Sequence, residues 1–292
     1  MDKHQHNNVP VTRRFIACTQ STGRIGKSTV ADGLISWLRY AGIPFAAVDC
    51  DAEHKTLSSR HHGDVALFDA TRSLDDFALL IDSLPDPPVI ITDFPAQATG
   101  FLLSGATHFR LLDTFAVSGI RPTILIFASD DETAQRSAAE TVSFFGDGAD
   151  YLLVENLARF RSSEFKKTAL YDWFTQRNTP TLEIPTITVV ALNAWADAER
   201  KAARGISLDE SVKASGPGFM AQFELEYIRN RFLVQFENYA DRIVPDKSLI
   251  KNKVSHALAS GKPSFSNPYT NPLLSKTKLK PVITPAKTTQ NG

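Results

Sequence analysis

The sequence predicts an α/β fold, in which helices cover both faces of a doubly wound, mostly parallel sheet. Short apolar runs alternate with segments of helical periodicity along the first two thirds of the chain. One run, 88–93, stays apolar until its last two residues, as expected for a strand that is buried on both faces. Acids close several of these runs, and the carboxyl ends of parallel strands meet at one edge of a sheet. We therefore expect one domain over 13–244, with a ligand site at that edge.

The expected elements alternate regularly along this domain. Residues 1–12 are polar and are expected to form a flexible leader. The expected strands are 13–19, 44–49, 65–68, 88–93, 123–128, 151–154 and 181–184. The expected helices between them are 30–41, 75–84, 101–115, 131–145 and 163–175. Gly42 ends the first of these helices as a C′ glycine would, and Pro85 closes the second.

The chain turns helical after residue 192. A short charged helix is expected at 194–204 and a long one at 219–239. The long helix carries four aromatic side chains near helical spacing, Phe223, Tyr227, Phe232 and Phe236. We interpret them as a stripe that faces the core, and keep a partner-binding groove as the alternative.

The segment 245–292 differs in composition from the rest of the chain. It holds eight Lys and one Asp, a net charge of +7, so the formally neutral chain leaves −7 for residues 1–244. Its content of Lys, Ser, Asn, Thr and Pro predicts a largely disordered basic tail. Such a tail could contact DNA non-specifically or bind an acidic partner, and a merely solubilising tail is the alternative.

Cysteine usage and hydropathy indicate the compartment. Cys18 and Cys50 lie in expected core strands and form no CxxC motif, which favours a reducing, cytoplasmic compartment. No apolar run approaches the ~18 residues of a membrane span, and no signal peptide is recognised. We therefore expect a cytoplasmic protein without a membrane span.

The chain is organised around the stretch 21–29, Ser-Thr-Gly-Arg-Ile-Gly-Lys-Ser-Thr, between the first expected strand and helix. A strand, a Gly-containing loop with Gly-Lys-Ser and a helix are the context of a phosphate-binding P-loop. The N–H groups of such a loop and of the first helical turn bind phosphate oxygens, aided by the helix dipole. The residues expected to bind the nucleotide are Gly23, Arg24, Ile25, Gly26, Lys27, Ser28 and Thr29. Lys27 would reach the β/γ-phosphates, Ser28 would bind Mg²⁺ and Thr29 would donate to the α-phosphate. Ser21 departs from the motif, which has Gly at that position.

Three acids complete the expected site. Asp49 and Asp51 follow the second strand, and Asp93 ends the run 88–93. Nucleotide hydrolysis needs a phosphate cradle, a metal held opposite it and a group that orients water. We expect Asp93 in the Mg²⁺ shell, through water, and Asp49 either beside it as a metal ligand or as a turn cap.

At these residues the chain resembles the ParA/MinD class of P-loop ATPases. The resemblance rests on Lys27, on Asp49-Cys50-Asp51 and on 90–93, and it covers roughly 13–187. Asp51 lies 24 residues after Lys27 (51 − 27), the separation typical of that class. The resemblance implies ATP and Mg²⁺ as cofactors, Asp51 and Lys27 as catalytic residues, and a nucleotide-dependent homodimer. It also places Asn156 near the nucleotide base, with an Asx turn as the alternative.

Two positions depart from that class. Its P-loop carries a signature lysine that reaches the partner's phosphates in the dimer, but here that position is Thr22, and the second glycine is Arg24. The lysine-dependent dimer switch is therefore not implied, although Arg24 brings a positive charge two positions later. The loop and the segment 203–210, which precedes the aromatic helix, are similar to plasmid-stability and conjugal-transfer relatives of ParA.

The leading hypothesis is a ParA-like ATPase whose ATP state controls dimerisation or partner binding in plasmid maintenance, partition or conjugal transfer. Its partner would be a plasmid-encoded DNA-binding or transfer protein. A second hypothesis, motivated by Thr22, is an adaptor that binds nucleotide without hydrolysing it. A small-molecule kinase or ligase on the same fold is a third. The motifs do not separate ATP from GTP.

Overall fold

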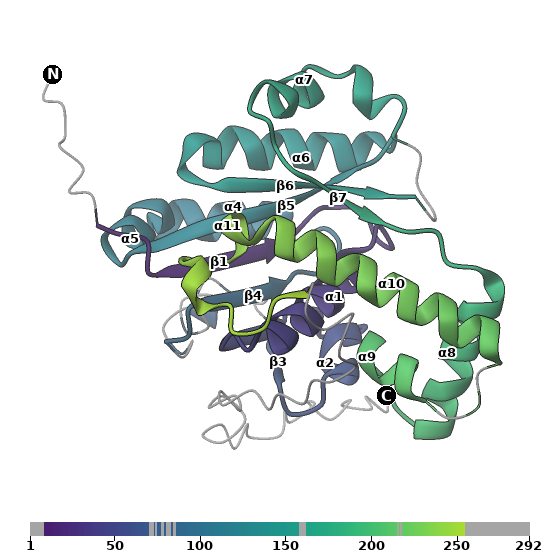
Figure 1. Cartoon of the computed structure of the whole chain (residues 1–292). Helices are drawn as coiled ribbons and strands as arrows, with labels where there is room; N and C mark the ends of the chain where they lie inside the picture. Colours follow the sequence, from purple (N-terminus) through teal and green to yellow (C-terminus); the bar gives the residue numbers. More distant parts are fainter. Residues whose placement is uncertain are drawn as a thin grey trace, which may run out of the picture.

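A seven-stranded, all-parallel sheet forms the centre of the molecule (Figure 1). The computed structural model describes residues 9–69, 73, 75–76, 79, 83, 86–157, 162–214, 216 and 218–254. The strands are β1 Arg13–Cys18, β2 Phe45–Asp49, β3 Val65–Leu67, β4 Val89–Asp93, β5 Ile120–Ala128, β6 Asp150–Asn156 and β7 Thr181–Ile184. Their order across the sheet is β3-β2-β4-β1-β5-β6-β7. The predicted α/β fold with a doubly wound parallel sheet is confirmed.

β1 is the central strand of the sheet. β4, β2 and β3 lie on one side of it, and β5, β6 and β7 lie on the other. β4 pairs with β1 on one side, with Cys18 opposite Asp93, and β5 pairs with β1 on the other side. β2 pairs with β4, with Asp49 opposite Asp93. The carboxyl ends of the central strands therefore bring the predicted acids to the loop that follows β1.

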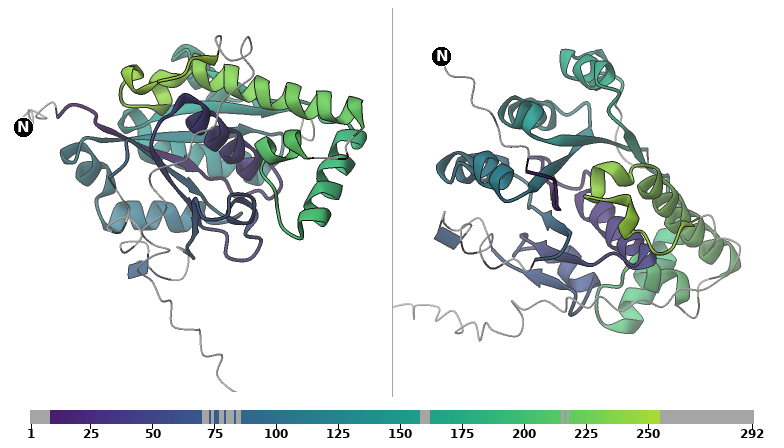
Figure 2. Two further views of the ribbon diagram at one scale, coloured as in Figure 1. Left: turned by 60° about the horizontal axis from the view of Figure 1, so that its bottom comes forward. Right: turned by 60° about the vertical axis from the view of Figure 1, so that its left-hand side comes forward.

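Helices cover both faces of this sheet (Figure 2). They are α1 Lys27–Ala41, α2 Thr56–Arg60, α4 Thr99–His108, α5 Leu111–Val117, α6 Glu132–Phe145, α7 Ala169–Gln176, α8 Val189–Ala202, α9 Leu208–Lys213, α10 Phe219–Asn238 and α11 Ala240–Ile243. Short 3₁₀ helices are η1 Gly146–Gly148, η2 Phe165–Lys167 and η3 Lys247–Leu249. Side chains of β1 alternate between the two faces, so Ile16 joins the core with α1 and α10, and Phe15 joins the core with α4 to α7.

The helix predicted at 101–115 is two helices, and that prediction is wrong in this respect. α4 ends at His108 and α5 begins at Leu111. Between them Arg110 has a φ of 47°, a left-handed conformation that cannot continue a right-handed helix. The helix predicted at 75–84 lies largely outside the described residues.

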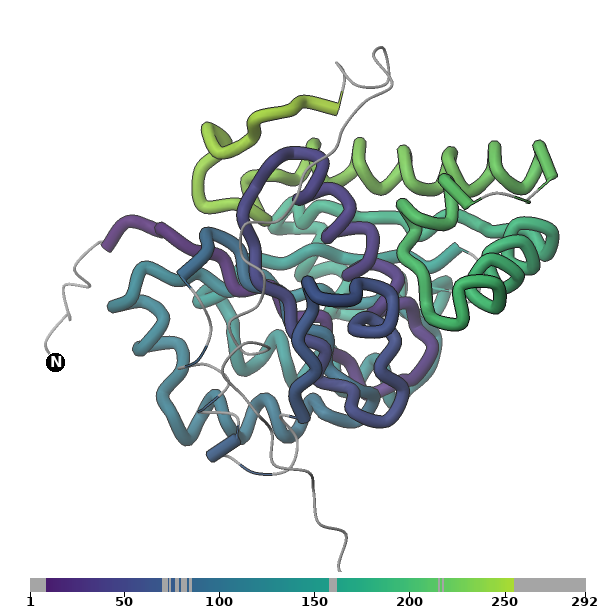
Figure 3. The backbone as a smooth tube through the Cα atoms, turned by 90° about the horizontal axis from the view of Figure 1, so that it is seen from below, coloured from purple at the N-terminus to yellow at the C-terminus, as the bar shows by residue number. Residues whose placement is uncertain are grey.

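The long helix α10 packs its second half on α1. Gly33 allows the close approach, since a Cβ there would lie 2.7 Å from the ring of Phe232. Phe232 and Phe236 are buried, as predicted for the aromatic stripe. The prediction is wrong for Phe223 and Tyr227, which are exposed because the first half of α10 extends past the sheet beside α8 and α9 (Figure 3).

After α11 the chain returns to the end of α1. The N–H of Lys251 donates to the Ala41 carbonyl (2.8 Å), and Asn252 Nδ2 donates to the Tyr40 carbonyl (3.0 Å). Residues 245–254 thus pack on the domain, and the rest of the predicted basic tail, 255–292, lies outside the described residues. In the part of the chain that the structure describes, no helix combines the length and apolarity that crossing a membrane requires.

Candidate functional site

One glycine shapes the loop between β1 and α1. Gly26 has a φ of 113°, a conformation that favours glycine. A Cβ on Gly26 would lie 2.4 Å from Ile184 Cδ1 and 3.1 Å from Asn156 Nδ2. The loop therefore passes too close to the ends of β6 and β7 for a larger residue. α1 begins at the next residue, Lys27, so the unpaired N–H groups of a helix N-terminus follow the loop directly.

The ammonium group of Lys27 is held inside this loop. Nζ donates to the carbonyl oxygens of Gln20 (3.2 Å) and Thr22 (3.0 Å), and the residue is buried. Burial lowers the pKa of Lys27, while the nearby Asp93, Cys18 and Asp51 act in the opposite direction. A buried cation that is bound only by carbonyl dipoles can bind a negatively charged oxygen more strongly.

Asp93 presents a buried carboxylate oxygen to the same place. The residue is 2% exposed, and its Oδ1 has no hydrogen-bond partner among the described residues. Burial raises the pKa of Asp93 to about 7. A hydrogen bond with Ser28 opposes this rise, as does the charge of Lys27, whereas Asp49 adds to it. Buried polar atoms in proteins are almost always satisfied, so an unpartnered oxygen marks a place for water or an ion.

Asp49 and Asp51 are both engaged by the backbone that follows them. Asp49 accepts the N–H groups of Asp51 (3.0 Å) and Ser58 (2.9 Å). Asp51 Oδ1 accepts those of Glu53 (3.2 Å) and His54 (2.9 Å). Both carboxylates thus cap turns, which was the alternative kept for Asp49. Their roles toward metal and water remain predictions.

Thr22, at the position of the signature lysine, is bound within its own chain. Its hydroxyl donates to Asp131 Oδ1 (2.8 Å), the same oxygen that caps α6 by accepting the N–H of Ala134 (2.8 Å). The N–H of Ser21 donates to Ser137 Oγ (3.1 Å), also on α6. Hydrogen bonds to the N-terminal part of α6 therefore hold the start of the loop in place.

Gln20 belongs to the site although no motif pointed to it. Its amide donates to the carbonyls of Phe127 (2.9 Å) and Ala134 (3.0 Å) and accepts the N–H of Phe127 (2.8 Å). These partners lie 107 and 114 residues away in sequence. Gln20 is a residue outside the P-loop pattern, so only the fold reveals its contact with β5.

The other predicted site residues lie in this loop or contact it. Asn156 Nδ2 donates to the Ile25 carbonyl (3.0 Å), so this side chain supports the loop from the end of β6. Its predicted contact with a base remains a prediction. Arg24 is exposed and has a φ of 60°, a left-handed conformation that favours glycine, and this is the position where the P-loop of the ParA/MinD class has glycine.

Neither a family model nor a curated protein matches the sequence. Solved structures are similar to it. The MinC:MinD cell division protein complex of Aquifex aeolicus has 13% identity and a TM-score of 0.44, over 76% of this chain and 96% of that chain. A plasmid partition protein from Borrelia burgdorferi has 13% identity and a TM-score of 0.36, over 61% and 90%. The signal recognition particle receptor FtsY from Elizabethkingia anophelis has 12% identity and a TM-score of 0.34, over 53% and 53%.

The class of fold follows from the topology of this chain itself. A parallel sheet with the order β3-β2-β4-β1-β5-β6-β7 carries the Gly-Lys-Ser loop directly after its central strand. This is a parallel α/β fold with a P-loop after its central strand, the arrangement expected in the sequence analysis.

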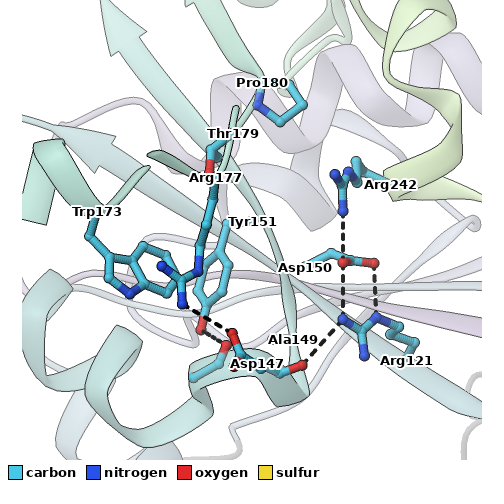
Figure 4. Close-up of a pocket in the computed structure, with 11 residues that line it drawn as sticks. Arg121, Asp147, Ala149, Asp150, Tyr151, Trp173, Arg177, Thr179, Pro180 and Arg242 are labelled. Carbon is cyan, nitrogen blue, oxygen red and sulfur yellow. Dashed lines mark hydrogen bonds and ion pairs between the residues drawn. The ribbon is translucent and has the colours of Figure 1, made fainter. Parts of the chain in front are cut away.

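A cavity of about 270 Å³ lies at the opposite, amino-terminal edge of the sheet (Figure 4). Its charged groups are paired with one another, although the Nε atoms of Arg14 and Arg242 have no hydrogen-bond partner among the described residues. Asp150 accepts hydrogen bonds from Arg14, from Arg121 Nε (3.0 Å) and from Arg242 Nη1 (2.8 Å). Burial alone would raise the pKa of Asp150, but the hydrogen bonds and charges of these arginines hold it below its ordinary value. This cluster joins β1, β5, β6 and α11, and we interpret it as structural.

Asp150→Ala is expected to destabilise the fold by about 3–5 kcal/mol, because it leaves three guanidinium groups around an empty place. Since the pKa of Asp150 is lowered on folding, its contribution is present above the unfolded value of about 3.9 and is lost as the pH falls through the folded pKa. Urea unfolding at neutral and acid pH measures both effects. Asp147→Ala is the control, because its side chain is 89% exposed. Equal losses for the two variants would contradict the interpretation.

Proposed function

We propose that the protein binds a nucleoside triphosphate, ATP in the first place, together with Mg²⁺, and that the bound state controls dimerisation or partner binding. The observation that carries this proposal is the unpartnered Asp93 Oδ1 beside the Ser28 hydroxyl and the Lys27 ammonium. A cation, a hydroxyl and a carboxylate at the start of the helix after a P-loop are the parts of a Mg²⁺–nucleotide site.

The residues fit a Mg²⁺ ion that is held jointly by protein and phosphate. Mg²⁺ in such sites keeps several waters and takes only one or two protein ligands. Ser28 and Asp93 would hold it, Asp93 through water, with Asp49 as a further candidate beside Asp93. When bound, Mg²⁺ neutralises charge on the β- and γ-phosphate oxygens. Among the described residues, no three His, Cys, Asp or Glu side chains form a metal cluster by themselves.

Lys27 would exchange its two carbonyl partners for phosphate oxygens. Hydrogen bonds between an ammonium and a phosphate are shorter and stronger than those to neutral carbonyls. The N–H groups of residues 23–29 would add further donors to the phosphates. Asn156 would keep the loop in place through its hydrogen bond to the Ile25 carbonyl.

Asp51 is proposed to orient the attacking water. Its carboxylate now accepts two N–H groups of the turn that leads into α2. Ordering or releasing this turn would therefore link the state of the nucleotide to the shape of the neighbouring surface, as switch segments do.

One observation favours the adaptor alternative, in which nucleotide is bound but not hydrolysed. Thr22 carries no charge and is bound to Asp131, so it supplies no cation to a partner's phosphates. Arg24, exposed at the tip of the loop, is the cation proposed to replace the signature lysine across a nucleotide-dependent homodimer. The hydrolysis experiment below decides between the two functions.

The cellular role is proposed from the motif resemblance. A ParA-like protein of this kind would act in plasmid maintenance, partition or conjugal transfer, with a plasmid-encoded DNA-binding or transfer protein as its partner. Non-specific DNA contact through the basic segment 245–292 would weaken steeply with salt.

Asp51→Ala is expected to lower steady-state ATP turnover at least about 100-fold, the usual loss when a group that activates water is removed. Nucleotide binding should persist, because Asp51 is placed at the water and not at the phosphates. Turnover with Mg²⁺ and direct binding of ATP and GTP are measured side by side. Glu53→Ala, an exposed acid on the same turn, is the control. A natural protein that binds nucleotide but never turns it over would favour the adaptor, and one that binds no nucleotide would refute both.

A further inference from the structure

The buried carboxylate of Asp32 joins three helices. Asp32 lies on α1, the helix that begins with Lys27, and is 1% exposed. It accepts a hydrogen bond from Nε2 of His61 (3.0 Å), directly after α2, and another from the N–H of Leu208 (3.2 Å), the first residue of α9. A buried carboxylate that loses a partner is left uncompensated, which is strongly unfavourable. These bonds therefore hold α1, the end of α2 and the start of α9 together.

The end of α2 also contacts α8 and the segment that links α8 to α9 (Figure 1). The guanidinium carbon of Arg60 lies 4.8 Å from the centre of the Trp195 ring, and its Nε lies 3.7 Å from Glu199 Oε1. Both partners belong to α8. A Cβ on Gly205, in the linking segment, would lie 2.6 Å from Ser59 Oγ. The end of α2 is thus attached to the unit 189–213, which consists of α8, the linking segment and α9.

The start of α2 is held by the two acids that follow β2. Asp49 Oδ2 accepts the N–H of Ser58, within α2 (2.9 Å), and the Asp51 carbonyl accepts that of Lys55, directly before α2 (2.9 Å). The Asp51 carboxylate caps the same turn. The proposed function requires these carboxylates at the metal and at the attacking water. The five-residue helix α2 therefore lies between the candidate site and the unit 189–213.

We propose that α2 couples the nucleotide site to the unit 189–213, an inference that rests on the proposed function. When Asp49 and Asp51 turn to the metal and the water, they release N–H groups at the start of α2. The helix then loosens, and its contacts with α8 and α9 weaken with it. These helices lie beside the half of α10 that extends past the sheet (Figure 3). The state of the nucleotide would thus change a surface outside the nucleotide site, as switch segments do.

Coupling between two sites is reciprocal, so weakening the contact of α2 with α8 should favour nucleotide binding. Arg60→Gln is expected to raise the affinity for ATP with Mg²⁺ about fivefold or more, as measured by titration calorimetry. Glu199→Gln breaks the same pair from α8 and should act in the same direction, which keeps the test valid if Arg60→Gln does not fold. An affinity that is unchanged or lower in the folded variants would overturn the proposal.

The matched control is Arg200→Gln, which removes another arginine of the unit 189–213. Arg200 is exposed and pairs with Asp197 within α8 itself. The affinity for ATP should therefore stay unchanged in this variant. If Arg200→Gln raised the affinity as much as Arg60→Gln does, the gain would come from the loss of a positive charge, and the coupling through α2 would be refuted.

Hydrogen exchange of the backbone amides tests the coupling in the natural protein. ATP with Mg²⁺ is expected to speed exchange about fivefold or more at 56–61 and at 205–212, which include the Leu208 amide bound to Asp32. ATP without Mg²⁺ should not, because the two acids then have no metal to turn to. Exchange at 138–145, within α6, should stay the same.

The two measurements together separate this inference from the proposed function. A protein that binds ATP with Mg²⁺ but shows unchanged exchange at 56–61 and 205–212 would overturn the coupling and leave the proposed function standing. A protein that binds no ATP would overturn both. Faster exchange at both segments, together with tighter binding by Arg60→Gln, is the result that the coupling requires.

Discussion

Lys27→Ala is expected to weaken ATP binding at least 100-fold, or by about 3 kcal/mol, since it removes charge-assisted hydrogen bonds to the β- and γ-phosphates. The fold should survive. Lys27 is buried and its pKa is lowered by that burial, so the ammonium costs free energy in the nucleotide-free protein. Titration calorimetry with ATP and Mg²⁺ measures the binding, and thermal unfolding measures the fold.

A control is needed because any lysine attracts ATP through its charge. Lys213→Ala removes an exposed lysine at the end of α9 and should leave the affinity unchanged. If both variants lost affinity equally, the attraction would be a general effect of charge, and the proposed place of the phosphates would be wrong.

The sequence predicted the sheet well because its strands are buried on both faces. The run that became β4 is fully buried, and such runs of β-branched residues can hardly be mistaken for helices. The parallel arrangement then placed Asp93 beside the P-loop without further assumptions. Helix boundaries were predicted less well, since the break at Arg110 depends on one residue in an unusual conformation.

The support of the loop could not be predicted from the sequence. The loop is held in place by hydrogen bonds of Gln20, Thr22 and Asn156. In each of these bonds the two residues are more than a hundred positions apart in the sequence. No local sequence pattern predicts such contacts, because they depend on which strands become neighbours in the sheet. The exposure of Tyr227 could not be predicted either, since helical spacing does not tell which part of a helix extends past the sheet.

Asp93→Asn is expected to make the nucleotide-free protein more stable above pH 7 and to abolish the effect of Mg²⁺ on nucleotide affinity. Burial raises the pKa of Asp93 to about 7, compared with about 3.9 in an unfolded chain. Between these values the native protein binds a proton that the unfolded chain has released, so stability falls as the pH rises from 4 to 7. A shift of roughly three units corresponds to about 4 kcal/mol at most, and the neutral amide of Asn avoids this cost.

Urea unfolding at pH 5 and pH 8, with no nucleotide present, distinguishes this effect from a simple loss of contacts. The difference between Asp93→Asn and the natural protein should grow with pH, because only the natural side chain becomes charged. A variant that is less stable than the natural protein at pH 8 would show that the carboxylate is satisfied in the native state. A gain in stability together with a lost response to Mg²⁺ would mean that the fold maintains an unfavourable buried charge where the metal is needed, as functional sites often do.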